Sequence, residues 1–237
     1  MSDFQELREQ VLEVNMALPR AGLVTLTWGN ASAVDRDRGV FAIKPSGVPY
    51  GDLRAADIVV LDLGDGKVID SDRSPSTDTP THWELYRAFE SIGGIVHTHS
   101  TWATAWAQAE REIPVYGTTH ADLCAIPIPL ARALTAEEIA DGYERNTGTV
   151  LIEIISKLDP EQLPCALLRG HAPFAWGHTA AKALEHAITL EAVAKLAHLT
   201  AMLGAQGSTL DPNVLHKHHE RKHGQHAYYG QVPADGA

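Results

Sequence analysis

The feature that most constrains this 237-residue chain is an apolar run that carries two histidines two positions apart, GGIVHTHS at 93–100. Because successive side chains of a β-strand alternate between its faces, His97 and His99 are predicted to project from the same face of a sheet. Two imidazoles placed in this way could bind one transition metal, and histidine is the commonest protein ligand of zinc. The pattern alone fits a pair of half-buried polar strand residues equally well, so further ligands must be sought elsewhere in the chain.

The composition indicates a globular protein, with 44% hydrophobic and 21% charged residues. The formal net charge of −11 argues against nucleic acid or an anionic membrane as the main partner, and an anionic substrate would need a local binding site. Two cysteines, Cys124 and Cys165, give neither a disulfide framework nor a Cys-x-x-Cys metal motif. The first residues lack the pattern of a signal peptide and no stretch is apolar enough to span a membrane, so a cytoplasmic location is expected.

The order of the predicted elements favours a layered α/β or α+β sandwich around a largely antiparallel sheet. No repeat, linker or low-complexity segment interrupts the chain, so residues 1–231 are expected to form one domain and 232–237 a disordered tail. Helices are predicted at 3–18, 79–89, 101–109, 179–203 and 211–223, and a capping box at 135–138 opens another. Strands are predicted at 24–27, 31–34, 40–43, 58–63, 93–100, 150–155 and 166–168, with a hairpin turn at 64–66.

Two further residues could complete a metal site with His97 and His99. His171 follows a predicted strand and precedes Pro173, although a lone loop histidine is more often a surface residue. Asp78 supplies a carboxylate just before a predicted helix, where a plain helix cap is the simpler interpretation. Three histidines and a carboxylate would make a zinc site able to accept substrate oxygens.

Other short segments could bind a phosphate or transfer protons. Lys44, Ser46 and Gly47 share one turn, Asn30 adds an amide, and Ser76 and Thr77 precede a helix N-terminus that attracts anions. Each segment alone also fits an ordinary turn. Candidate acid/base groups are Asp122 and a tyrosine of the pair at 228–229. A run of five histidines between 216 and 226 fits a solvated helix face better than a metal site.

Taken together, these segments resemble the L-ribulose-5-phosphate 4-epimerases of the class II, zinc-dependent aldolase family, over residues 5–231. The resemblance is carried by LVTLTWGN (23–30), IKPSGV (43–48), STDTPTH (76–82), IGGIVHTHS (92–100), GTTHAD (117–122), PFAWG (173–177) and RKHGQHAYYGQ (221–231). The family often has glycine where this chain has Ala172, and the preceding Arg169-Gly170 is also unusual. The terminal Tyr-Tyr-Gly-Gln is typical of the epimerases rather than of the related fuculose and rhamnulose phosphate aldolases.

The resemblance implies the fold of that family, an α/β/α sandwich around the sheet, and a role for each matching residue. It implies metal binding by Asp78, His97, His99 and His171, and acid/base catalysis by Asp122 and Tyr229. It implies substrate and phosphate binding by Asn30, Lys44, Ser46, Gly47, Ser76 and Thr77. Tyr229 would reach in from a neighbouring subunit, and His218 would approach the adjacent subunit's site. Sibling aldolases have glutamate at the position of Asp78, where it serves as ligand and base.

The reaction implied is interconversion of L-ribulose 5-phosphate and D-xylulose 5-phosphate. Its route would be metal-assisted retro-aldol cleavage between carbons 3 and 4, rotation of glycolaldehyde phosphate and re-addition. The expected cofactor is one divalent ion per subunit, Zn²⁺ with Mn²⁺ and Co²⁺ as alternatives, and the expected assembly is a homotetramer with sites between subunits. Arabinose catabolism and ascorbate use both employ this chemistry. Two alternatives stay open: a class II aldolase that releases its aldehyde, and a non-catalytic binding module of the same fold.

Overall fold

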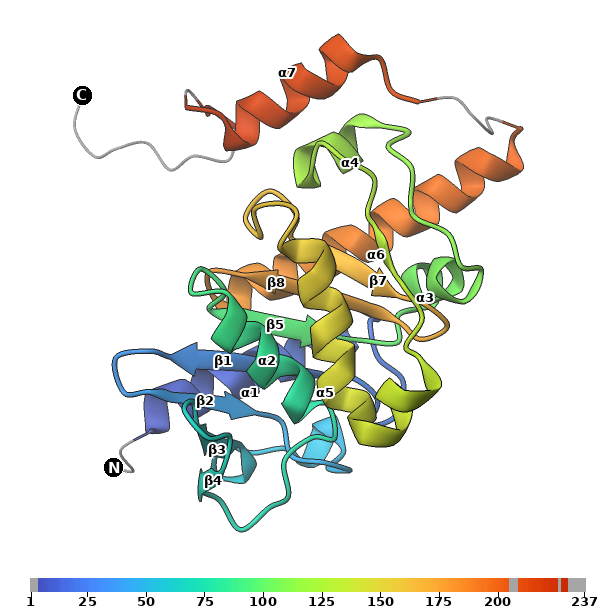
Figure 1. Ribbon diagram of the computed structural model, residues 1–237. Helices are drawn as coiled ribbons and strands as arrows, with labels where there is room; N and C mark the ends of the chain where they lie inside the picture. The colour runs from blue at the N-terminus through green and yellow to red at the C-terminus, as the bar shows by residue number, and fades with distance from the viewer. Residues whose placement is uncertain (1–3, 205–208, 226, 230–237) are drawn as a thin grey trace, which may run out of the picture.

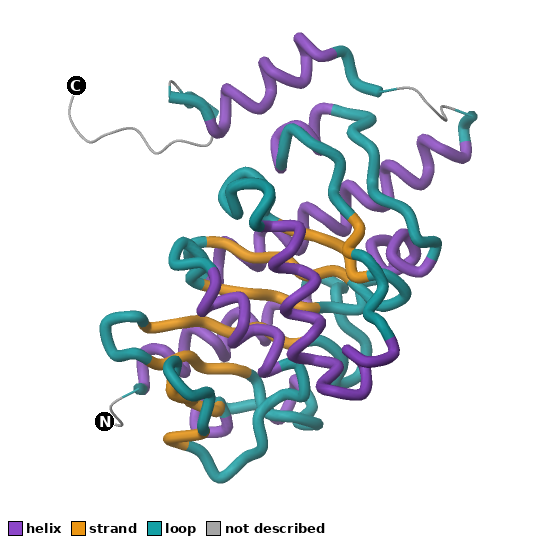
Figure 2. The backbone as a smooth tube through the Cα atoms, in the orientation of Figure 1, coloured by secondary structure: helices purple, strands orange, loops and turns teal. Residues whose placement is uncertain are grey.

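A single eight-stranded sheet runs through the protein (Figures 1 and 2). The computed structural model describes residues 4–204, 209–225 and 227–229. The expected tail at 232–237 lies outside these ranges. The strands are β1 (Asn30–Asp35), β2 (Val40–Ile43), β3 (Val59–Asp62), β4 (Val68–Asp70), β5 (Gly94–His97), β6 (Leu130–Ala131), β7 (Cys165–Leu168) and β8 (Pro173–Gly177). Their order across the sheet is β4-β3-β2-β1-β5-β8-β7-β6, with every neighbouring pair antiparallel except β6 and β7.

Helices cover both faces of this sheet, so the predicted α/β/α sandwich with a largely antiparallel sheet is confirmed. One face carries α1 (Gln5–Arg20), α3 (Thr101–Gln108) and α6 (Ala180–Met202). The other face carries α2 (Thr79–Ala88) and α5 (Ala136–Ile155), which pack against each other. Two further helices, α4 (Thr118–Leu123) and α7 (Pro212–His223), contact each other at the end of the molecule that is uppermost in Figure 1. In the part of the chain that is described, no helix is long and apolar enough to cross a membrane.

Alternation along β5 divides the core into two apolar layers. Val96 belongs to the layer under α1 and α6, whereas Ile95 belongs to the layer under α2 and α5. His97 is two residues beyond Ile95, and its ring accordingly stacks on Phe174 of the second layer. The strand that carries the first histidine is therefore covered on both sides, and its imidazole lies on the α2/α5 face.

Two glycines let α6 approach the sheet closely behind this histidine. A Cβ atom on Gly94 would lie 2.3 Å from Ala180 Cα, and one on Gly93 would lie 2.1 Å from the carbonyl oxygen of His178. No side chain fits at such distances, so the pair Gly93-Gly94 sets the depth at which the start of α6 packs on β5.

The prediction of a strand at 24–27 is wrong. This segment forms a turn in which the Trp28 amide donates to the Thr25 carbonyl, and Leu26 has a positive φ of 54°. Gly29 explains why the segment turns: it has a φ of 83°, and a Cβ atom there would lie 2.9 Å from the His97 carbonyl oxygen. The close approach of this loop to β5 overrides the β propensity of the sequence.

The prediction of a strand at 150–155 is also wrong, because this run is the last part of α5. Thr135 and Glu138 form the predicted capping box, and the helix they open continues to Ile155. Val150, Leu151 and Ile155 are buried against the sheet. A short apolar run of this kind fits a buried helix face as well as a buried strand.

The remaining differences concern the ends of the predicted elements and three short elements that were missed. The histidine strand ends at His97, so His99 lies in the loop that leads into α3 rather than in the strand. Strands β6 and β8 and the short helix α4 were not predicted. The hairpin between β3 and β4 is confirmed, with the Asp62 carboxylate accepting from the amides of Gly64 and Asp65.

Candidate active site

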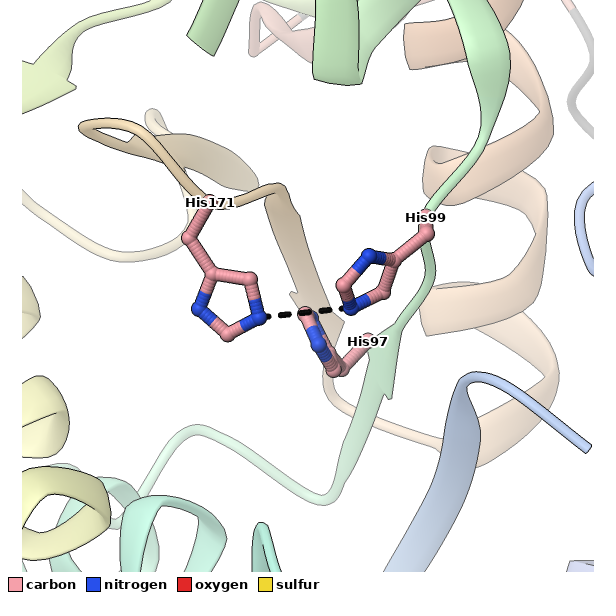
Figure 3. A group of neighbouring side chains, drawn as sticks. All are labelled: His97, His99 and His171. Carbon is pink, nitrogen blue, oxygen red and sulfur yellow. Dashed lines mark hydrogen bonds between the residues drawn. The ribbon is translucent and has the colours of Figure 1, made fainter. Parts of the chain in front are cut away.

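Three histidine rings converge at the end of β5 (Figure 3). His97 ends the strand, His99 follows in the loop before α3, and His171 lies in the turn between β7 and β8. One ring nitrogen from each lies within 4.8 Å of the others, and the Nε2 atoms of His99 and His171 are 3.2 Å apart. The sequence prediction that these three residues come together is therefore matched by their positions.

The ring of His97 is held with one nitrogen free. Its Nδ1 lies 2.9 Å from the Pro173 carbonyl oxygen, and because a carbonyl only accepts, Nδ1 carries the hydrogen. The lone pair is thus on Nε2. Stacking on Phe174, with ring centroids 4.1 Å apart, restricts the ring further. A hydrogen bond from the other ring nitrogen to a carbonyl is how proteins orient histidine ligands.

The charge state of the cluster suits a cation. Burial, and next the neighbouring His97 and His99, lower the pKa of His171 to about 4, and burial followed by His97 also lowers the pKa of His99. Both rings are therefore neutral near pH 7 and have a lone pair to offer. Zinc takes nitrogen ligands at about 2.0–2.1 Å in tetrahedral geometry, which places two ligand nitrogens roughly 3.3 Å apart. The 3.2 Å separation of His99 and His171 fits such an ion.

Asp78 lies beside the three histidines, but it is not part of the group whose ligand atoms all lie within 4.8 Å of one another. It precedes α2 and its Oδ2 accepts a hydrogen bond of 2.7 Å from Asn30 Nδ2. Burial alone would raise the pKa of Asp78, but His97, His82 and the Asn30 amide lower it overall. A carboxylate thus stands next to the three imidazoles, and its role as a metal ligand stays a prediction.

A cleft of about 620 Å³ opens beside the histidines. It is bounded by the loop before β1, the turn after β2, the segment before α2 and one stretch of α5. Nine of the residues singled out from the sequence line it: Asn30, Lys44, Ser46, Gly47, Ser76, Thr77, Asp78, His99 and His171. His97 is buried at the end of β5 and supplies its ring from the sheet.

The two serine-containing segments meet because their backbones pair. The Ser46 amide donates to the Ser74 carbonyl, and the Ser76 amide donates to the Lys44 carbonyl. The Asn30 amide also donates to Ser76 Oγ at 3.1 Å, which ties β1 to the same place. Hydroxyl groups 30 residues apart in the sequence thereby line one wall of the cleft, next to the N-terminus of α2.

Lys44 places a buried positive charge on this wall. Its side chain is 2% exposed, and its Nζ lies 3.3 Å from the Pro45 carbonyl and 4.9 Å from the Tyr50 ring centroid. Burial lowers the pKa of the ammonium group. No carboxylate among the described residues pairs with it within 4.0 Å. A buried cation without an anionic partner favours an anion in the adjoining cleft.

Six residues that line the cleft were not singled out as site residues from the sequence, namely Thr27, Trp28, Gly29, Pro45, Tyr143 and Glu144. Tyr143 and Glu144 follow Gly142, where α5 is interrupted by a φ of 152°. A glycine inside a helix opened by a capping box is the sequence signal that could have marked them. Trp28 is 54% exposed, and its ring centroid lies 6.3 Å from that of His99.

The other predicted catalytic residues form a second cluster on α4 and α7. The Asp122 carboxylate accepts from Arg221 Nε at 3.1 Å and Nη2 at 2.6 Å, and His218 Nδ1 lies 3.3 Å from the same carboxylate. The Tyr229 ring lies 4.4 Å from the Arg221 guanidinium. Burial would raise the pKa of Asp122, but Arg221 and His218 lower it. Arg221 was not singled out, although it begins the RKHGQHAYYGQ segment.

These residues do not line the histidine cleft of the same chain. Asp122, His218 and Tyr229 instead surround Arg221, so within one chain the predicted acid/base residues and the predicted metal ligands belong to separate places. Asp122 and Tyr229 can have their predicted roles only if a neighbouring copy of the chain places its Asp122–Tyr229 cluster beside the histidine cleft of this one.

The fold is an α/β sheet sandwich, and its polar cleft lies beside three clustered histidines that could hold a metal ion. Residues 9–198 match the model of the class II aldolase and adducin N-terminal domain, and the chain belongs to that family. Members typically use a divalent metal, most often zinc, and act on phosphorylated sugars as oligomers.

Solved structures share the fold. An L-fuculose 1-phosphate aldolase superposes with a TM-score of 0.74 at 23% identity, covering 91% of this chain and 95% of its own. YgbL from Escherichia coli superposes with a TM-score of 0.71 at 23% sequence identity, covering 91% of this chain and 98% of its own. An aldolase II superfamily protein from Pseudomonas syringae superposes with a TM-score of 0.75 at 15% sequence identity, covering 94% of this chain and 86% of its own. At such identities the likeness establishes the fold alone.

Replacing His97 with Gln should lower the zinc content of the purified protein from about one equivalent per chain to near zero, because one of three converging nitrogens is lost. The measurement is elemental analysis after zinc loading and gel filtration. His198→Gln, which changes a histidine that packs on Trp102 outside the cluster, is the matched control and should keep its zinc. Full zinc content in a folded His97→Gln protein would exclude His97 as a ligand.

Proposed function

We propose that this chain is an L-ribulose-5-phosphate 4-epimerase, which interconverts L-ribulose 5-phosphate and D-xylulose 5-phosphate. The observation that carries the proposal is the cleft itself, which combines three converging imidazoles, an unpaired buried lysine and two hydroxyl-bearing segments. Such a cleft suits a substrate with vicinal oxygens at one end and a phosphate at the other. Family membership supports the reaction class, and the epimerase assignment rests on the motifs at both ends of the chain.

The phosphate would lie against the wall formed by Ser46, Gly47, Ser76 and Thr77. Gly47 has a φ of 69°, and a Cβ atom there would meet nothing within 4 Å, so its backbone faces open space. The helix dipole at the start of α2 and the charge of Lys44 favour an anion at the same wall. Asn30, whose amide is fixed by Ser76 and Asp78, would contact the sugar between the phosphate and the histidines.

Inversion of carbon 4 by direct deprotonation would be hard, because no carbonyl is adjacent to acidify that hydrogen. Cleavage between carbons 3 and 4 avoids the difficulty, because deprotonation of the carbon-4 hydroxyl lets that bond break and leaves a three-carbon fragment and an aldehyde phosphate. A divalent ion held by the histidines and Asp78 would supply Lewis acidity toward the ketone and neighbouring hydroxyl oxygens. The phosphate wall would retain the aldehyde while it rotates, so that re-addition occurs on its other face.

Proton transfer at the carbon-4 oxygen is assigned to Asp122 and Tyr229 on opposite faces of the aldehyde. These residues would come from a neighbouring subunit of a homotetramer, with His218 approaching the adjacent site. Arg221 would then hold the Asp122 carboxylate ionised and contact the Tyr229 ring, as it does within the chain. A carboxylate kept ionised can accept a proton, and a neutral phenol can donate one.

A class II aldolase that releases its aldehyde is the second candidate. The L-fuculose 1-phosphate aldolase fold favours it, whereas Asp78 disfavours it, because the sibling aldolases have a longer glutamate there. A non-catalytic binding module fits less well, since none of the residues that the resemblance assigns to catalysis or metal binding is replaced in this chain.

The first test is a coupled assay of the zinc-loaded protein on L-ribulose 5-phosphate. We expect D-xylulose 5-phosphate to form and glycolaldehyde phosphate to stay below detection, because the aldehyde is retained. An aldehyde dehydrogenase added as a trap would report any release. Stoichiometric aldehyde without D-xylulose 5-phosphate would establish the aldolase instead.

Ser46→Asp should raise KM for the sugar phosphate at least tenfold with a smaller effect on kcat, because a carboxylate would face the phosphate. Steady-state kinetics measure this change. Ser71→Asp is the matched control, because Ser71 lies outside the cleft and its Oγ accepts from the Arg73 amide, as an aspartate could. An unchanged KM in Ser46→Asp would place the phosphate elsewhere.

Tyr229→Phe should lower kcat by roughly 10²–10⁴-fold, the usual effect of losing an acid/base group, with zinc content unchanged. Tyr228→Phe, which changes the adjacent exposed tyrosine, should stay near the unmodified rate. Mixing Tyr229→Phe with His97→Gln subunits tests whether the cluster and the histidines of one cleft come from different chains. If each cleft takes its histidines from one chain and its Asp122–Tyr229 cluster from a neighbour, mixed oligomers contain some intact clefts and recover activity. No recovery after confirmed subunit exchange would contradict a site shared between chains.

A further inference from the structure

The ring of His171 has a partner on α5. The Tyr143 hydroxyl lies 3.1 Å from His171 Nδ1, and the ring centroids are 6.1 Å apart. The opposite ring nitrogen, Nε2, is the one that faces His99 in the cluster (Figure 3). Tyr143 therefore contacts the ring of His171 on the side that points away from the other histidines.

The fold fixes Tyr143 at this position. Gly142 interrupts α5, and the helix after it packs closely on α2. Thr81 Oγ1 of α2 donates to the Glu144 carbonyl at 2.6 Å. Gly148 permits the close approach, because a Cβ atom there would lie 2.9 Å from Glu84 Cβ. The same helix α2 begins beside Asp78, so Tyr143 and the cleft are built on one pair of helices.

His171 needs such a partner more than His97 does. His97 ends a central strand, stacks on Phe174 and donates to a backbone carbonyl. His171 lies in a turn after Gly170, which has a φ of 68°. Apart from the facing His99, Tyr143 is the hydrogen-bond partner of the His171 side chain among the described residues.

The chemistry of a phenol suits this contact. A phenol has an ordinary pKa of about 10, so the hydroxyl is neutral near pH 7. A neutral phenol oxygen can accept a hydrogen bond from Nδ1–H. That bond leaves the lone pair of His171 on Nε2, the same tautomer that the Pro173 carbonyl imposes on His97.

We propose that Tyr143 is a positioning residue that holds His171 in the ring orientation and tautomer needed to bind the divalent ion. The inference rests on the metal site of the proposed function, but it does not depend on which sugar phosphate is the substrate. Partners that orient a histidine ligand in this way typically change metal affinity by about 10–100-fold when removed.

The test is zinc affinity, measured by competition with a chromophoric chelator. Tyr143→Phe should weaken zinc binding about 10–100-fold. The melting temperature of the metal-free protein should stay close to that of the unmodified chain, because the ring is kept. Tyr228→Phe removes a phenol hydroxyl outside the cleft and should leave zinc affinity unchanged. Cobalt substitution gives a second readout, because a reoriented His171 should change the visible absorption of the bound ion.

A double-mutant cycle tests whether Tyr143 acts through His171. In a His171→Asn background, Tyr143→Phe should have no further effect on zinc affinity. A further loss there, or unchanged zinc affinity in Tyr143→Phe alone, would overturn the proposal. A lower kcat with unchanged zinc affinity would also overturn it and would assign Tyr143 to the substrate. If His97→Gln also keeps its zinc, the metal site itself fails rather than only the role of Tyr143.

Discussion

The pairing of β5 with β1 on one side and β8 on the other determines the geometry of the histidine site. It sets Asn30, His97 and Phe174 opposite one another across three strands. Neighbouring residues in register share a face, so an amide, an imidazole and an aromatic ring lie in one row. Behind this row, Gly93 and Gly94 let the start of α6 lie against β5 at distances that exclude any side chain. The polar groups of the cleft are thus carried by elements packed on both sides of one strand, which limits their freedom to separate.

The charge at the wall of the cleft is opposite in sign to the net charge of the whole chain. The protein carries a formal charge of −11, yet the wall with Lys44 presents a buried cation, and burial lowers the pKa of both His99 and His171. Local groups can therefore attract a phosphorylated substrate that the overall field would repel. In the second cluster, on α4 and α7, the positive charge is paired, because the Arg221 guanidinium forms a salt bridge with the Asp122 carboxylate. In the proposed function, the two sets of groups act together only across a boundary between subunits.

Local signals in the chain were enough to predict the class of fold and most of the cleft. Strand alternation, capping residues and turn glycines predicted the antiparallel sheet and most helices, and the motifs around Ser46, Asp78, His97 and His171 marked residues that converge. These signals failed where packing between distant segments determines the secondary structure. The run at 150–155 is apolar enough for a strand, and its packing on the sheet as the end of α5 makes it helix.

The groups that support the marked residues could be identified from the folded chain but not from the sequence. Tyr143 and Trp28 were not singled out, because their positions depend on the break in α5 at Gly142 and on the close approach of the Gly29 loop to β5. Likewise, the motifs marked Asp122 and Tyr229 but not Arg221, which contacts both. A side chain's chemistry can be read from the sequence, whereas its neighbours are set by contacts between distant segments that folding brings together.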